Sequence, residues 1–247
     1  MDTPGSGDRY TVWRKAFAEF LGSALLVATV VGSGIAAQTL SPDDVGLQLL
    51  ENSIATGAVL VALILALGPV SAAFNPVVTL AERALGAVTN SEAAIFITAQ
   101  VTGACLGSVL ANLMFELDAV TISTKERSGG GLWLAEVVAT FGLLVVIFGV
   151  VRSGRDALVP FAVGGYIAAA YWFTSSTSFA NPAVTIARTL TDTFAGIDPT
   201  SVLAFVAMQL IGGALAVGAV LALYPHARDV AADVADLNPT EKDRTHG

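Results

Sequence analysis

Two Asn-Pro motifs and two acidic residues in apolar surroundings are the features of this sequence most able to carry chemistry. The motifs are Asn75-Pro76-Val77 and Asn181-Pro182-Ala183, and the acidic residues are Glu19 and Glu136. Asn is a preferred N-cap, and Pro suits the first helical position because its missing N–H would be unpaired there. A carboxylate within an apolar helix is costly and usually functional. These residues predict a polar site inside an otherwise apolar protein.

The sequence shows no arrangement typical of an enzyme. We find no nucleophile–base pair, no metal-ligand cluster and no phosphate-binding loop, and both histidines, His226 and His246, lie near the C-terminus. The single cysteine, Cys105, is most simply a small core hydrophobe. We therefore predict that the protein is not an enzyme and holds neither a metal nor a cofactor.

Composition points to a lipid bilayer as the main solvent. Of the 247 residues, 54% are hydrophobic and only 13% are charged, whereas soluble domains average about 25% charged residues. The net charge of −8 arises largely in loops and the C-terminal tail and gives no reason to expect nucleic acid as a partner.

Six apolar stretches are long enough to cross the bilayer, which takes about 20 residues of helix. This predicts an all-α membrane protein with polar tails at residues 1–12 and 226–247 and a membrane domain at 13–225. Arg14-Lys15 followed by an apolar run is similar to a signal peptide, but Glu19 and the length of the run favour a retained helix. The predicted spans are 13–37, 47–67, 91–115, 133–152, 157–175 and 200–223.

The distribution of Lys and Arg predicts the orientation. Nine of the twelve fall on one side of the predicted membrane and three on the other, so the positive-inside rule places both termini in the cytoplasm of a plasma-membrane protein. The nine are Arg9, Arg14, Lys15, Arg83, Arg152, Arg155, Arg228, Lys242 and Arg244, and the three are Lys125, Arg127 and Arg188.

The chain contains an internal repeat, with repeat one at about 13–115 and repeat two at about 133–225. An Ala-Glu pair opens each repeat, an Asn-Pro motif follows, and a Gln-x-x-Gly pattern comes last, at Gln100 and at Gln209. Each repeat holds three spans, so the second must be inserted upside down, and inverted repeats place a solute site near the bilayer midplane. The spacing of Gly103 with Gly107, and of Gly212 with Ala216, predicts close helix contacts that pack the two halves together.

The segments 76–86 and 182–191 are apolar but too short to span. At about 1.5 Å per residue, ten residues cover roughly 15 Å, so each is predicted to be a half-helix that starts near the midplane. The backbone before each one is predicted to be irregular, which is tolerated at this depth only when it is buried in protein or lines a watery cavity.

These elements predict a passive channel for uncharged solutes. Two half-helix N-termini, each worth about half a positive charge, would face the midplane beside the amides of Asn75 and Asn181. A neutral hydroxyl-bearing solute can accept hydrogen bonds there, whereas a cation or proton meets positive potential and dehydration. Glu19 and Glu136 have two interpretations: they are coupling carboxylates of a transporter, or acceptors for loop N–H groups. Their symmetric placement favours the second.

From about Trp13 to Tyr224 the sequence resembles the aquaporin, or major intrinsic protein, family, in which the motif is Asn-Pro-Ala twice. The resemblance implies six tilted helices, two half-helices that meet at the centre, one pore per subunit and a homotetramer. It also implies that Glu19 and Glu136 buttress the two irregular loops.

The resemblance further implies a selectivity filter near the outer side. Its positions would be Val184, Ser178, Ala169 and either Thr56 or Ala55. Water-selective members combine Arg with His and an aromatic residue there, so this filter is predicted to be wide and neutral. Arg188, one turn after Val184, would either supply the missing charge or face outward in a loop or subunit contact, and the second is favoured.

A wide, neutral filter favours glycerol-like polyols, arsenous acid and water as solutes. The replaced filter arginine and the Asn-Pro-Val motif are similar to those of bacterial aquaglyceroporins associated with arsenic resistance. The alternatives are a strict water channel, a secondary transporter that uses Glu19 and Glu136, and a non-conducting scaffold.

Overall fold

The computed structural model describes residues 10–224, which form helices joined by loops and contain no strand. Six of the helices are long and apolar enough to cross a membrane, which confirms the six predicted spans to within a few residues. The predicted tail 226–247, with His226 and His246, and most of the tail 1–12 lie outside the described residues. The six are α1 (Val12–Leu40), α2 (Val45–Leu67), α4 (Asn90–Met114), α5 (Gly130–Arg152), α6 (Val159–Phe173), preceded by the 3-10 helix η1 (Asp156–Leu158), and α8 (Pro199–Leu223).

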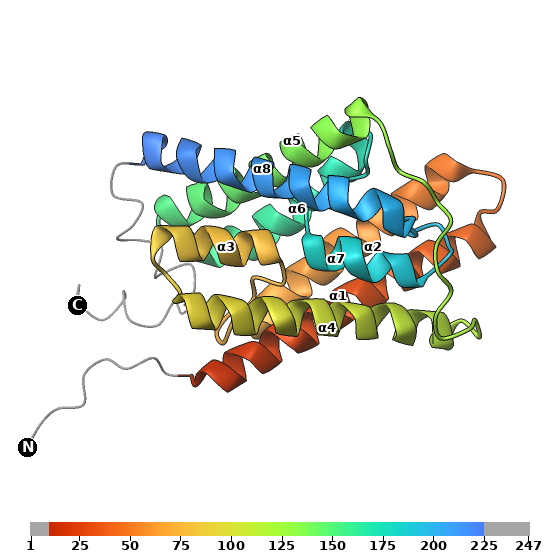
Figure 1. The fold of residues 1–247 in the computed structure, drawn as a ribbon, viewed down its shortest axis with the longest axis horizontal. Helices are drawn as coiled ribbons and strands as arrows, with labels where there is room; N and C mark the ends of the chain where they lie inside the picture. The colour runs from red at the N-terminus through yellow and green to blue at the C-terminus, as the bar shows by residue number, and fades with distance from the viewer. Residues whose placement is uncertain (1–9, 225–247) are drawn as a thin grey trace, which may run out of the picture.

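The two predicted half-helices are present and are buried among the six spans. The first, α3, covers Pro76–Leu85, and the second, α7, covers Pro182–Ala187 and continues as the 3-10 helix η2 (Arg188–Leu190). Figure 1 shows α3 and α7 running in opposite directions from the middle of the bundle, with their N-termini facing each other.

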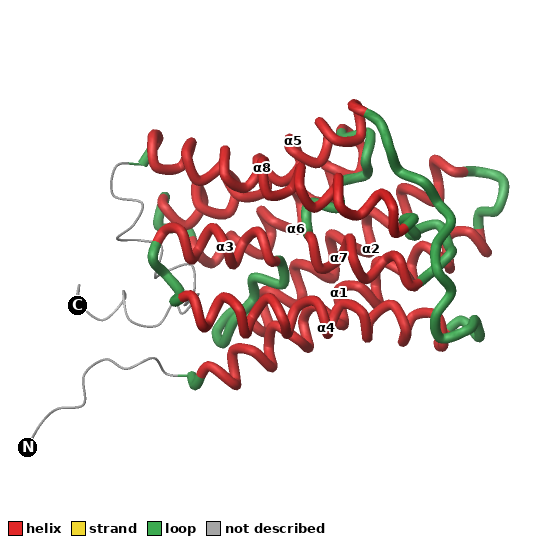
Figure 2. The backbone as a smooth tube through the Cα atoms, viewed as in Figure 1, coloured by secondary structure: helices red, strands yellow, loops and turns green. Residues whose placement is uncertain are grey.

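The loops that lead into the half-helices lie inside the bundle rather than at its ends (Figure 2). Phe74 and Ala180, the residues before the two motif asparagines, have positive φ angles of 48° and 49°. Non-glycine residues adopt this region at a cost of roughly 1–2 kcal/mol. The loops therefore need side chains that hold them in place.

Glycines set the closest helix contacts inside each repeat. A Cβ at Gly103 would lie 2.2 Å from the carbonyl oxygen of Phe20, which brings α4 against α1. A Cβ at Gly212 would lie 2.5 Å from the carbonyl oxygen of Val137, which brings α8 against α5. The prediction that these small residues join the two halves is wrong for the three glycines, because Gly103 and Gly107 face α1 and Gly212 faces α5, each a helix of its own repeat.

The two halves approach each other closely at a different pair of glycines. A Cβ at Gly57 on α2 would lie 2.9 Å from the carbonyl oxygen of Gly164 on α6, and a Cβ at Gly164 would lie 2.5 Å from that of Gly57. This reciprocal contact lets the backbones of α2 and α6 touch. It lies directly beside Thr56, a predicted filter residue.

Polarity is arranged as expected for a protein in lipid. Large apolar side chains such as Leu203 and Trp13 are exposed on the bundle, whereas Glu19, Glu136 and Gln209 have no exposed surface. Burying ionisable and polar side chains inside a membrane protein is costly, and such residues are usually functional. The polar interior is therefore the place to look for a functional site.

Candidate functional site

The motif asparagines begin the half-helices. The side-chain Oδ1 of Asn75 accepts a hydrogen bond from the N–H of Val77 at 3.0 Å, and Oδ1 of Asn181 accepts from the N–H of Ala183 at 2.9 Å. Each motif proline occupies the first helical turn. The capping predicted from the Asn-Pro pairs is therefore present at both helices.

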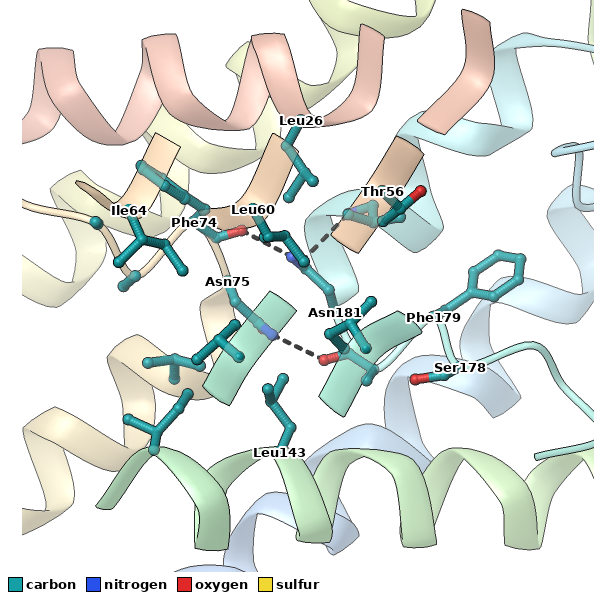
Figure 3. Close-up of a pocket in the computed structure, with 18 of the residues that line it drawn as sticks. Leu26, Thr56, Leu60, Ile64, Phe74, Asn75, Leu143, Ser178, Phe179 and Asn181 are labelled. Atoms are coloured by element: carbon teal, nitrogen blue, oxygen red, sulfur yellow. Dashed lines mark hydrogen bonds between the residues drawn. The ribbon is translucent and has the colours of Figure 1, made fainter. Parts of the chain in front are cut away.

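The same two asparagines brace each other's loops. Asn75 Nδ2 donates to the carbonyl oxygen of Ala180 at 2.8 Å, and Asn181 Nδ2 donates to that of Phe74 at 2.7 Å (Figure 3). An Asn amide carries two N–H donors. No described residue accepts from the second donor of either amide, so one N–H of each remains for the cavity that both line.

Glu19 holds the first loop from within α1. Its Oε1 accepts from the N–H of Ala73 at 2.9 Å and from the hydroxyl of Ser71, and its Oε2 accepts from the N–H of Phe74 at 2.7 Å. Gln100 Nε2 adds a fourth hydrogen bond at 2.8 Å. Charge-assisted bonds of this kind are about twice as strong as neutral ones.

Glu136 does the same for the second loop from within α5. Its two oxygens accept from the N–H groups of Phe179 at 3.0 Å and Ala180 at 2.9 Å, and from Gln209 Nε2 at 2.6 Å. The two carboxylates thus make matching contacts in the two repeats. These contacts are the ones that the loop-acceptor interpretation requires.

A cavity of about 90 Å³ passes the asparagine pair. Its lining includes Lys15 from the start of α1 and Glu82 from the last turn of α3, together with Ser178 from the second loop and Arg188 from η2. A water needs about 10–15 Å³ of such volume, so the cavity has room for several waters. Its walls are mainly apolar, and they include Leu26, Leu60, Ile64, Leu143, Ile147, Val163 and Ile167.

Three of the predicted filter residues line this cavity. Thr56, Ser178 and Val184 are all buried and all contribute to the lining, whereas Ala55, the alternative to Thr56, is only half-buried and does not. The hydroxyl oxygen of Ser178 has no hydrogen-bond partner among the described residues. This oxygen is itself buried, so its missing partner does not make it a contact for a solute.

The assignment of Ala169 is wrong, because this residue is exposed on the outer face of α6. The α6 residues that line the cavity recur every four positions: Val159, Val163, Ile167 and Tyr171. A helix turns by about 100° per residue, so Ala169 points about 200° away from Ile167 and Tyr171, the lining residues two positions before and after it. Tyr171 occupies the place expected for Ala169, and its hydroxyl lies 3.0 Å from Thr56 Oγ1.

The favoured interpretation of Arg188, an outward-facing side chain, is also wrong. Arg188 is 2% exposed and lines the cavity. Its Nε donates to the carbonyl oxygen of Ala195, and its guanidinium carbon lies 3.5 Å from the centre of the Phe179 ring. Arg127 lies 5.0 Å from the same ring. Burial lowers the pKa of Arg127 to about 10, so it still carries its charge near neutral pH.

Sequence reasoning missed Tyr171, Phe179, Arg127 and Glu82 as parts of the site. The sequence could have predicted that Tyr171 lines the cavity, since it continues the four-residue spacing of apolar residues along α6. Glu82 had another, since it stands seven residues after Asn75, as Arg188 does after Asn181. Arg127 comes from a distant loop, and no pattern in the sequence places it at the site.

Comparisons with known proteins agree with this geometry. The family model described as major intrinsic protein matches residues 7–178. The chain is 49% identical over 222 residues to the aquaglyceroporin AqpS of Rhizobium meliloti (strain 1021), covering 90% of this chain and 94% of that protein. It is 31% identical over 166 residues to the aquaporin AqpM of Methanothermobacter marburgensis, covering 58% and 67% respectively.

Among solved structures, the aquaglyceroporin from Plasmodium falciparum superposes with a TM-score of 0.69 at 18% identity, covering 88% of this chain and 99% of that one. At this identity the likeness shows the shared fold. Together with the sequence matches it shows that this chain belongs to the major intrinsic protein family, whose members are membrane channels and not enzymes.

Proposed function

We propose that this channel conducts small uncharged polyhydroxylated solutes, with glycerol-like polyols, arsenous acid and water as its solute class. The observation that carries the proposal is the asparagine pair, which offers one free N–H from each amide to a cavity whose remaining wall is largely apolar. A solute with hydroxyls along one edge satisfies these donors while its other side contacts the apolar wall.

The predicted filter positions that line the cavity, Val184, Ser178 and Thr56, carry small or medium side chains, and this favours solutes larger than water. The filter is not neutral and uniformly small as the sequence predicted, because Arg188 and Tyr171 line the same cavity. Similarity to the aquaglyceroporin AqpS over most of both chains favours the same class of solute. Arsenous acid fits the class because it is uncharged near neutral pH and carries three hydroxyls on one centre.

We further propose that protons and ions are excluded. The N-termini of α3 and α7 both face the centre, and each contributes roughly half a positive charge there. A cation or a hopping proton would meet this potential without its hydration shell. The prediction is a negligible proton or sodium current through the purified protein.

The test is stopped-flow light scattering on proteoliposomes, with water, glycerol and arsenous acid compared in the wild type and in Val184→Arg. We expect the wild type to pass all three and Val184→Arg to suppress glycerol and arsenous acid more than water. Passage of water alone would favour the strict water channel. Flux that requires an ion gradient would favour a transporter that uses Glu19 and Glu136.

The assembly and location belong to the same proposal. We propose a homotetramer in the plasma membrane with both termini in the cytoplasm, on the basis of the family resemblance and the Lys and Arg distribution. Native mass spectrometry of the detergent-solubilised protein tests the tetramer, and a monomeric mass would contradict it.

A further inference from the structure

Arg188 is fixed in place but keeps most of its donors unused. The Ala195 carbonyl oxygen accepts from Nε, and the Phe179 ring covers one face of the guanidinium. Arginine has five N–H donors, and no described residue accepts a hydrogen bond from the four on its terminal amino groups. Those donors belong to a side chain that is 98% buried and lines the cavity.

Glu82 stands at the matching position of the other repeat. It follows Asn75 by seven residues, as Arg188 follows Asn181. Asn75, Val78 and Glu82 share one face of α3, because residues spaced by three and four lie above one another on a helix, and all three line the cavity. Glu82 is 6% exposed and is the one acidic residue in the described lining.

The Glu82 carboxyl group differs from the two loop carboxylates. Glu19 accepts four hydrogen bonds and Glu136 accepts three, whereas no described residue donates one to Glu82. Lys15 and Glu19 are the charged residues that act electrostatically on it. A carboxyl group accepts hydrogen bonds in either protonation state, so Glu82 offers acceptor oxygens to the cavity throughout.

We propose that Arg188 and Glu82 are the two solute-binding groups at the ends of the pore. Arg188 donates hydrogen bonds to solute oxygens at the outer end. Glu82 accepts hydrogen bonds from solute hydroxyls at the inner end. The inference rests on the proposed channel function and specifies its ligand: a neutral molecule that both accepts and donates, as a polyol does.

The test measures the ratio of glycerol to water permeability in proteoliposomes for variants at both positions. Arg188→Met and Glu82→Met keep side-chain length but remove the donors or the acceptor, and each should lower the ratio by about threefold to tenfold, the worth of one hydrogen bond. Glu82→Gln keeps an acceptor oxygen and Arg188→Lys keeps a donor, so both should stay near the wild-type ratio. Arg155→Leu and Glu116→Leu, at exposed loop positions, are the matched controls.

Three outcomes would overturn the inference. An unchanged or raised ratio in the Met variants would make the two side chains obstacles rather than binding groups. A lowered ratio in Glu82→Gln or Arg188→Lys would show that hydrogen bonding is not the feature that matters, even if the Met variants fail to fold. If Lys15→Met lowered the permeability ratio as much as Glu82→Met does, and Glu82→Gln lowered it too, Glu82 would act only as a counter-ion to Lys15. A wild type that passes no glycerol would instead refute the proposed function, so the two failures are distinguishable.

Discussion

At the scale of single residues, each motif asparagine has two structural roles, as a helix cap and as a hydrogen-bond donor to the other repeat. The carbonyl oxygen of each amide caps its own half-helix, and the nitrogen bonds the loop of the other repeat. The buried carbonyl oxygens of Phe74 and Ala180 depend on these nitrogens for their partners. Each asparagine therefore couples the start of a helix to the shape of the opposite loop.

Replacing either asparagine should destabilise the protein. Asn181→Ala removes the cap, worth about 1 kcal/mol, and leaves the Phe74 carbonyl oxygen unpaired at about 1–3 kcal/mol. We expect the melting temperature in detergent to fall by about 5–10 °C, and Asn75→Ala to behave alike. The control is Asn90→Ala, whose exposed side chain bonds Arg83. Equal melting temperatures for all three variants would contradict the bracing role.

The position of Tyr171 leads to a steric test of the outer pore. Because Ala169 is exposed on the outside of α6, Ala169→Trp should leave glycerol and water flux unchanged. Val184→Trp places the same bulk inside the cavity and should abolish glycerol flux. The measurement is light scattering on proteoliposomes with equal protein content. Blockage by Ala169→Trp would restore the original filter assignment.

Individual side chains mark where sequence reasoning succeeded and where it failed. The roles open to Asn75, Asn181, Glu19 and Glu136 could be inferred because each occurs twice at matched places. The Ala169 assignment failed because a count along the chain crosses an irregular loop, where residue number no longer sets the facing direction. Arg188 was misplaced because its direction depends on the switch from α7 to the tighter η2, which no local signal announces.

At the scale of elements, the two irregular loops depend on buried side chains for their shape. Each is strained by positive φ angles and held by one buried glutamate. We infer that Glu19 and Glu136 act as loop buttresses. In this interpretation the carboxylates stabilise the loops through hydrogen bonds and take no part in proton coupling.

Glu19→Gln tests that inference, because an amide presents a donor where two acceptor oxygens are required. An N–H of Ala73 or Phe74 would then lose its partner, at about 1–3 kcal/mol. We expect a lower melting temperature and a proportional loss of both glycerol and water flux, and the same from Glu136→Gln. A variant that keeps passive flux but loses uphill uptake in the presence of a proton gradient would favour the transporter instead.

The close contact between α2 and α6 at Gly57 and Gly164 can be tested by substitution. Gly57→Val would place side-chain atoms against the Gly164 backbone, where even a Cβ would lie 2.9 Å from the carbonyl oxygen. Neither backbone can move without separating the two halves next to Thr56. We expect little folded protein by size-exclusion chromatography. Gly218→Val, where a Cβ meets nothing within 4 Å, should elute as the wild type does.

The elements themselves were largely predictable. Six spans follow from apolar length, and the half-helices follow from Asn-Pro caps on segments too short to cross. The glycine contacts were only partly predictable: spacing along one helix shows that Gly103 and Gly212 can face a neighbour, but it does not show which neighbour. That choice depends on packing between segments distant in the chain.

At the scale of the whole molecule, the inverted repeat places corresponding residues at opposite ends of one pore. Asn75 and Asn181 each bond the other repeat's loop at the centre, whereas Glu82 and Arg188 come at the far ends of α3 and α7, which run in opposite directions (Figure 1). The sequence predicts the inversion because each repeat has three spans. An acidic residue, Glu82, and a basic residue, Arg188, therefore stand at corresponding positions of the two repeats, so the repeats differ where they approach the two solutions.

The orientation of that asymmetric pore can be measured directly. The start of α1 and the end of α8 lie at the same end of the bundle (Figure 1), and Arg14, Arg83 and Arg152 belong to that end by the order of spans. Positive residues favour the cytoplasmic side, so the loop 116–129 should face outward. In a Cys105→Ala background, Ser128→Cys should react with a membrane-impermeant maleimide on intact spheroplasts, and Ser153→Cys, at the other end, only after permeabilisation. Both serines are exposed, so the two variants control for each other. The reverse pattern would invert the pore and place Glu82, rather than Arg188, at its outer mouth.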